Sequence, residues 1–168
     1  LAEPSIDIIY IATPPATHKA LALQVARSGK HVFVEKPMAM RFAECAEIVD
    51  ECAAKKVQLF VAFYRRALPR FLQIKHWIDE GKIGKALSVR VVHNRPPEPE
   101  VRSRETLPWR FLPEVSGGGI FLDMGAHTLD ILDFFFGKIE RVQGFATNLA
   151  GFYDVEDTVT ATWQHQNA

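Results

Sequence analysis

Short apolar runs alternate with amphipathic segments over the first 62 residues of the chain. Residues 6–12, 31–35 and 57–62 have the length and composition of strands, and the first is a continuous apolar run that predicts burial on both faces. Residues 16–28 and 41–55 predict helices, since apolar side chains in the second recur at helical spacing. This alternation predicts right-handed crossovers and a parallel sheet.

A different pattern follows from Pro69 onward. Pro69 can open a helix that ends at Gly81, and apolar positions alternate over residues 87–93 as in a strand. Residues 94–118 carry the string RPPEPE and predict a long loop, a kind of segment that is usually functional or mobile.

The last third of the chain predicts a helix and two further strands. Three glycines, Gly117 to Gly119, lead into a helical pattern that stops at Gly137. Residues 142–149 and 158–164 predict strands, and the second alternates threonine with apolar residues as in an antiparallel sheet with one buried face. The second half therefore predicts an α+β arrangement.

Composition narrows the class of protein. Apolar residues make up 48% of the chain, which is enough for a packed core. Twenty Lys and Arg balance twenty Asp and Glu, so there is no basic footprint for nucleic acid or an anionic membrane. No apolar run approaches the ~20 residues that a membrane span needs. Cys45 and Cys52 predict buried, reduced thiols, which suit a cytoplasmic protein.

Candidate ligand-binding residues follow the predicted parallel strands. Ligands bind at the carboxyl ends of such strands, where residues 13–18, 35–37 and 63–66 lie. Lys36, if partly desolvated, can act as a proton donor or an electrostatic clamp, and Pro37 fixes the turn after it. The carboxylate of Glu35 can accept hydrogen bonds from a ribose or from the turn. Taken alone, each segment is better explained without a ligand, as a turn, the start of a helix or a solvated ion pair, and only the combination of segments favours a binding site.

A second group of candidates surrounds the glycine run. Asp123 and His127 are four residues apart and share a helical face, so the carboxylate can assist an acid/base histidine. A metal half-site and a purely structural helix are the alternatives, but without a third ligand nearby no metal site is predicted. Trp109 and Arg110 can cover a planar ligand and bind its phosphate or carboxylate, or Trp109 can simply anchor the loop.

The combined motifs resemble those of the glucose–fructose oxidoreductase/inositol 2-dehydrogenase (Gfo/Idh/MocA) family from about Asp7 to Ala161. The segments that carry the resemblance are IATPPATH, GKHVFVEKPMA, RRALP, EGKIGKALSV, WRFLPEVSGGGIFLDMGAHTLDIL and VEDTV. The resemblance implies an α/β chain: the C-terminal part of a Rossmann-like parallel sheet in residues 1–65, then an α+β domain with an open, mainly antiparallel sheet in residues 66–168 that serves substrate binding and homo-oligomer formation.

The resemblance also implies a cofactor, NAD or NADP, and roles for the candidate residues. Lys36 would lie near the nicotinamide and the reacting hydroxyl, His127 would be the acid/base, and Asp123 would bind substrate or assist it. The implied catalytic residues are thus Lys36, His127 and Asp123. The implied cofactor-binding residues are Thr13, Pro14, His18, Glu35, Lys36, Pro37, Trp109 and Arg110.

The chain departs from the family pattern at its start. It begins at Leu1 rather than Met, and it contains neither the glycine-rich turn that cradles the pyrophosphate nor the residue that selects NAD or NADP, which we expect upstream. The end of the chain also looks cut, because residues 164–168 come just after a predicted strand and the chain ends there.

Three hypotheses follow for the function. The first is hydride transfer between nicotinamide and a hydroxyl-bearing carbon of a sugar, cyclitol or related polyol. The second is a non-catalytic sensor that binds a nucleotide or sugar. A sensor does not need an acid/base pair, so the presence of Lys36, Asp123 and His127 argues against this hypothesis. The third is an assembly module without activity.

Overall fold

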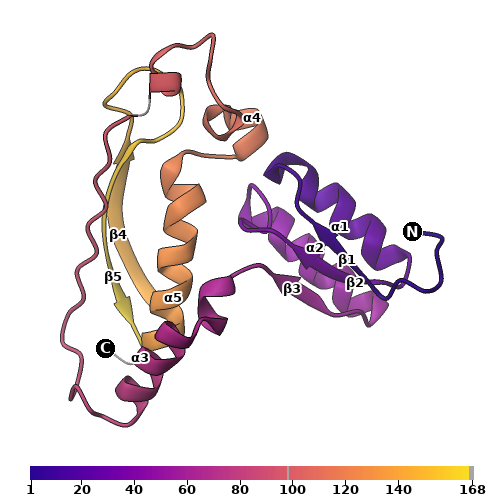
Figure 1. Cartoon of the computed structure of the whole chain (residues 1–168), viewed down its shortest axis with the longest axis horizontal. Helices are drawn as coiled ribbons and strands as arrows, with labels where there is room; N and C mark the ends of the chain where they lie inside the picture. Colours follow the sequence, from indigo (N-terminus) through magenta and orange to yellow (C-terminus); the bar gives the residue numbers. More distant parts are fainter. Residues whose placement is uncertain (98, 167–168) are drawn as a thin grey trace.

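The computed structural model describes residues 1–97 and 99–166, and its first part is a three-stranded parallel sheet with two helices (Figure 1). The strand order is β1-β2-β3, and both pairs are parallel, as the sequence predicts. The elements of this part are β1 (Ile8–Ile11), the 3-10 turn η1 (Pro15–Thr17), α1 (His18–Arg27), β2 (His31–Val34), α2 (Phe42–Lys55) and β3 (Leu59–Val61).

Helices α1 and α2 cover one face of the parallel sheet. Val32 and Val34 of β2 and Ile48 of α2 are fully buried there and form the centre of the main core. Helix α2 ends where Lys56 adopts the left-handed conformation, which turns the chain into β3. The parallel order brings the carboxyl ends of β1, β2 and β3 to one edge, where the segments after each strand meet.

The prediction that the first strand is buried on both faces is wrong. Ile8 and Tyr10 of β1 are 44% and 52% exposed, because the two helices lie on the opposite face, where Ile11 is buried. The exposed face carries a row of aromatic rings: the centroid of Phe33 lies 4.9 Å from that of Tyr10 and 6.3 Å from that of Phe60.

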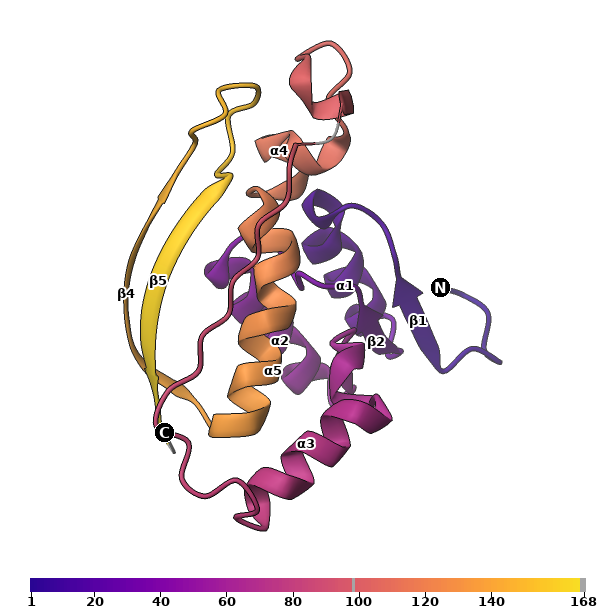
Figure 2. The same ribbon diagram turned by 60° about the vertical axis from the view of Figure 1, so that its left-hand side comes forward.

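The second part combines helices with a two-stranded antiparallel sheet. Its elements are the 3-10 turn η2 (Tyr64–Ala67), α3 (Pro69–Asp79), the 3-10 turns η3 (Pro99–Arg102) and η4 (Trp109–Phe111), α4 (Pro113–Ser116), the π turn η5 (Phe121–Gly125), α5 (Ala126–Phe136), β4 (Ile139–Thr147) and β5 (Thr158–His165). Helix α5 lies between the parallel-sheet part and the β4–β5 pair, and α3 lies across its lower end (Figures 1 and 2). No helix among the described residues has the length and apolar character of a membrane span.

The predicted strand over residues 87–93 is wrong for this structure. The segment runs along the β4–β5 pair in Figure 1 as an irregular trace and pairs with no strand of the described chain. Leu87 is 85% exposed, and Val89 and Val91 are also exposed. Alternating apolar residues form a strand only where a neighbouring strand satisfies their backbone groups.

A small second core fixes the long loop that follows. Val101, Tyr153 and Val155 are buried together, and the ring of Phe111 packs 4.6 Å from that of Tyr153. Arg104 adds a two-pronged ion pair with Asp154, at 2.7 and 3.1 Å. The loop before α4 and the β4–β5 connection therefore form one unit, which presents Trp109 and Arg110 to the site described below.

Candidate functional site

A pocket of about 160 Å³ lies where the carboxyl edge of the parallel sheet meets the turns before α5. Its lining comes from four places in the chain: the segment after β1, the segment after β2, the η4 turn, and the stretch from the end of α4 through the glycine run into η5. The lining residues are Ala12, Thr13, Pro15, Glu35, Lys36, Pro37, Trp109, Arg110, Ser116, Gly118, Gly119, Leu122 and Asp123.

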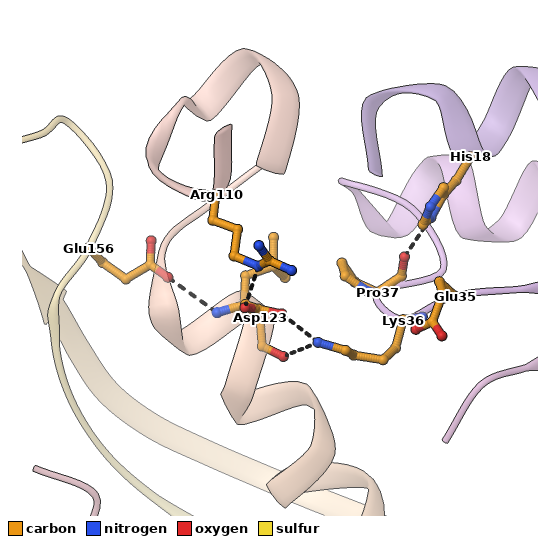
Figure 3. A network of polar contacts seen from close by, with 8 residues as sticks. His18, Glu35, Lys36, Pro37, Arg110, Asp123 and Glu156 are labelled. Atoms are coloured by element: carbon orange, nitrogen blue, oxygen red, sulfur yellow. Dashed lines mark hydrogen bonds and ion pairs between the residues drawn. The ribbon is translucent and has the colours of Figure 1, made fainter. Parts of the chain in front are cut away.

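Lys36 and Asp123 form an ion pair across this pocket (Figure 3). The ammonium of Lys36 donates to a carboxylate oxygen of Asp123 and, at 3.0 Å, to the backbone carbonyl of the same residue. The guanidinium Nε of Arg110 lies 3.5 Å from the other carboxylate oxygen, and its Cζ lies 4.5 Å from the ring centroid of Trp109. Two cations from separate segments thus converge on one carboxylate at the pocket wall.

Glu35 is held in place by its neighbours. One carboxylate oxygen accepts a hydrogen bond from the Tyr10 hydroxyl, and the other accepts the backbone N–H of Lys36 at 3.1 Å. The hydrogen bond to Glu35 raises the pKa of Tyr10. The carboxylate of Glu35 therefore has a defined orientation at the pocket wall, next to Lys36.

His127 lies in the first turn of α5 and is 5% exposed. The ring centroids of Phe63 and Tyr64 lie 6.2 and 5.2 Å from that of His127, both nearly perpendicular to it. Burial lowers the pKa of His127, the positive charges of Lys36 and Arg65 lower it further, and Asp123 and Glu35 act in the opposite direction. Its buried Nδ1 has no hydrogen-bond partner among the described residues. The lowered pKa favours the neutral imidazole, which is the form that can accept a proton.

The glycine run serves close packing. A Cβ on Gly119 would lie 2.0 Å from the backbone oxygen of Glu156, and one on Gly117, where φ is +81°, would lie 2.6 Å from Cβ of Met40. The Glu156 carboxylate accepts the backbone N–H groups of Gly119 at 2.7 Å and Leu122 at 3.3 Å. The start of the helical segment that bears Asp123 is thereby capped from the β4–β5 connection.

His18 is fully buried at the start of α1. Its Nδ1 lies 2.9 Å from the carbonyl oxygen of Pro37, and its Nε2 lies 2.7 Å from that of Thr13. The imidazole therefore faces the backbone of two pocket-lining segments, and its ring is not exposed to the pocket.

The structure gathers most of the residues that the sequence singles out. Those that line the pocket are Thr13, Glu35, Lys36, Pro37, Trp109, Arg110 and Asp123, whereas Pro14, His18 and His127 do not line it. The Asp123 side chain pairs with Lys36 and Arg110, and its charge also acts on His127 by raising the pKa of the imidazole, so the predicted assistance of His127 by Asp123 stays a prediction.

Sequence reasoning assigned no role to Glu156. In the sequence, Glu156 is an acidic residue just before the last predicted strand. That position does not indicate which helix N-terminus its carboxylate will cap. Pro15, from the predicted segment 13–18, lines the pocket, and so do Ser116 and Leu122, for which the sequence predicted no role. Within residues 1–97 and 99–166, no cluster of three or more His, Cys, Asp or Glu side chains is arranged to hold a metal ion.

Family models match both parts of the chain. Residues 1–63 match the model described as the oxidoreductase family, NAD-binding Rossmann fold, and residues 71–168 match the model of the GFO/IDH/MocA C-terminal domain. The predicted division between residues 65 and 66 falls in the segment between the two matches and stays a prediction.

Curated relatives and solved structures point the same way. Oxidoreductase P35 of Formosa agariphila is 36% identical over 138 residues, covering 82% of this chain and 43% of the relative. Myo-inositol 2-dehydrogenase of Thermotoga maritima is 32% identical over 141 residues, covering 83% and 39%. The chain thus spans less than half the length of these curated relatives.

Among solved structures, levoglucosan dehydrogenase in complex with NADH and levoglucosan superposes with a TM-score of 0.85 at 28% identity, covering 99% of this chain and 46% of that one. The WlbA dehydrogenase from Bordetella pertussis in complex with NADH and UDP-GlcNAcA gives 0.82 at 32% identity, covering 99% and 47%. With an NAD-binding Rossmann part and the matching C-terminal part, the chain belongs to the Gfo/Idh/MocA oxidoreductase family.

Proposed function

We propose that the whole protein is an NAD(P)-dependent oxidoreductase that transfers a hydride between nicotinamide and a hydroxyl-bearing carbon of a sugar, cyclitol or related polyol. The observation that carries the proposal is the meeting of Lys36, from the edge of the Rossmann part, with Asp123, from the C-terminal part, at one pocket. Relatives named for inositol and levoglucosan support the substrate class.

The reaction needs three tasks that these side chains can share. Lys36 would polarise the substrate oxygen and stabilise the negative charge that develops on it during oxidation. His127, whose lowered pKa favours the neutral form, would accept the hydroxyl proton. Asp123, paired with Lys36 and Arg110, would orient the lysine and accept a hydrogen bond from a neighbouring substrate hydroxyl.

The pocket residues fit the nicotinamide end of a dinucleotide. Thr13 offers a hydroxyl, the oriented Glu35 carboxylate offers acceptors for ribose hydroxyls, and the Trp109 ring offers an apolar surface. The space beside Gly117 is occupied by Met40, and the space beside Gly119 is occupied by Glu156. In the described chain this glycine run therefore leaves no room for the phosphates of a dinucleotide. NAD(P), when bound, supplies the acceptor for the hydride.

A screen of polyols with the whole protein tests the proposal. Inositols, anhydrosugars, aldoses and nucleotide sugars are supplied with NAD or NADP, and the absorbance of the reduced cofactor is followed. We expect substrate-dependent reduction with at least one of these compounds and a preference for one cofactor. Binding of cofactor and sugar with no reduction by any of them would favour the sensor hypothesis instead.

We further propose that the whole protein works in the cytoplasm as a homo-oligomer joined through its C-terminal sheet. Val142 and Phe145 are 71% and 61% exposed on opposite faces of β4, so each face of this strand carries an exposed apolar side chain that a protein partner could cover. Free cysteines at positions 45 and 52 suit a reducing compartment. Light scattering of the whole protein and its Phe145→Glu variant tests the assembly, which the charge should weaken.

A further inference from the structure

His18 lies between two segments that both line the candidate site. It is fully buried, and its two ring nitrogens face the carbonyl oxygens of Thr13 and Pro37 at 2.7 and 2.9 Å. Thr13 follows β1, and Pro37 follows β2 directly after Lys36. Figure 3 shows the imidazole directed at the Pro37 carbonyl, on the side of the turn away from Asp123.

The two carbonyl oxygens that face His18 can be satisfied only by N–H donors on the imidazole ring. A carbonyl oxygen only accepts, so each of the two contacts is a hydrogen bond only when the facing ring nitrogen carries a proton. A neutral tautomer donates to one carbonyl, and the imidazolium donates to both. An apolar side chain of similar size would leave both carbonyls facing a group that cannot donate, and buried unpaired polar groups are costly.

We propose that His18 is a positioning residue for Lys36. By holding the Pro37 carbonyl against the segment that carries Thr13, it fixes the backbone from which the Lys36 side chain crosses to Asp123. His18 then acts through backbone geometry and touches neither cofactor nor substrate. The effect on turnover rests on the proposed function, whereas the effect on the Lys36 side chain does not.

Three substitutions separate the two contacts. The side-chain nitrogen of asparagine reaches about as far as Nδ1 of histidine, and that of glutamine about as far as Nε2. His18→Asn therefore keeps a donor toward Pro37, His18→Gln keeps one toward Thr13, and His18→Leu keeps neither. If His18 positions Lys36 through Pro37, the asparagine variant should behave most like the original protein.

The first measurement is the rate at which each amine of the whole protein is acetylated, followed by mass spectrometry. The reference is Lys19, whose ion pair with Glu47 lies on the surface. We expect Lys36 to react several-fold faster relative to Lys19 in the glutamine and leucine variants, and close to the original rate in the asparagine variant. Equal Lys36 rates in the original protein and in the asparagine and glutamine variants would overturn the proposal. The comparison of the asparagine and glutamine variants tests the proposal even if the leucine variant does not fold.

The second measurement is turnover. A misplaced Lys36 should lower kcat by about 10- to 100-fold in the glutamine variant, with KM for the cofactor little changed, and less in the asparagine variant. Ordered acetylation rates without any dehydrogenase activity in the original protein would reject the proposed function and leave the role of His18 standing. If the original protein is active but Lys36 is acetylated at the same rate in the asparagine and glutamine variants, the role of His18 is rejected and the proposed function stands.

Discussion

The Lys36 ammonium donates to both the side chain and the backbone of Asp123, a residue 87 positions later in the chain. Lys36 leaves the end of β2 in the Rossmann part, and Asp123 lies in the π turn that precedes α5. This ion pair joins the two parts of the chain at the pocket, with side chains that are 15% and 26% exposed. Partial burial makes the pair a stronger electrostatic feature than a surface ion pair.

Replacement of Lys36 with alanine should lower kcat of the whole protein by about 10²- to 10³-fold, since the developing charge on the substrate oxygen loses its partner. The dissociation constant of the cofactor should change only a few-fold. Steady-state kinetics and calorimetry check the two values. Lys19→Ala, which removes a surface ion pair with Glu47, is the matched control and should leave both unchanged. Turnover near that of the control would rule out the role given to Lys36.

The acid limb of activity should follow His127. Its pKa in the folded protein is below the ordinary value of 6.5, so the neutral, proton-accepting form persists to lower pH than for an exposed histidine. We expect kcat/KM for oxidation to stay level as pH falls through about 6.5 and to decline only below it. Arg65→Gln removes a charge that lowers the pKa of His127, so the decline should begin at higher pH. Arg70→Gln is the control, and an unmoved limb in Arg65→Gln would contradict the assignment.

The same histidine should make the fold sensitive to acid. Between pH 6.5 and the lower pKa of the folded state, the unfolded chain binds a proton at His127 that the folded protein does not. The free energy of unfolding should therefore decrease as pH falls through this range and level off below it. Urea unfolding at several pH values should show a shallower decrease in His127→Gln than in the original protein. Parallel curves for the two proteins would mean that other groups cause the decrease.

Gly119→Ala should destabilise the chain by about 1–3 kcal/mol, the range typical of overpacking. The added Cβ would lie 2.0 Å from the backbone oxygen of Glu156, and backbone cannot yield as a flexible side chain can. Gly118→Ala is the matched control, because the three atoms nearest its Cβ would all belong to side chains: two carbons of Leu122 at 3.1 Å and Oε2 of Glu156 at 3.5 Å. Chemical denaturation of both variants tests the difference. Equal stability would show that the Glu156 contact is not tight.

Arg66→Ala should destabilise the packing of α5. The Nε of Arg66 donates to Asp130 at 2.8 Å, and the side chain of Asp130 is only 8% exposed, so the variant leaves a buried carboxylate unpaired. Since Arg66 itself is partly exposed, we expect a loss of about 1–3 kcal/mol. Lys75→Ala breaks a more exposed pair with Asp79 and should cost about 0.5 kcal/mol or less. A loss in Arg66→Ala no larger than in this control would show that water replaces the lost partner.

Much of the fold was open to prediction because its signals are local. The strands of the parallel sheet, both of its helices, the helix from Pro69 and the β4 and β5 strands were all predicted from periodicity and breakers, with small shifts at their ends. Two predictions were wrong because they depended on neighbouring elements. Residues 87–93 have no neighbouring strand to pair with in the described chain, and β1 is covered by helices on one face only. Periodicity gives a segment its preferred shape but does not supply its neighbours.

The candidate site divides in the same way. Local sequence patterns were enough to predict which chemical groups were available, that Lys36 follows a strand, and that the motifs resemble one family. Packing of the two parts of the chain was needed to show that the Asp123 carboxylate pairs with Lys36 and Arg110, that His18 turns inward to two carbonyls, and that Gly119 leaves space for Glu156. These outcomes depend on contacts between residues far apart in the chain, and the distances and burial that fix them exist only once the two parts have packed together.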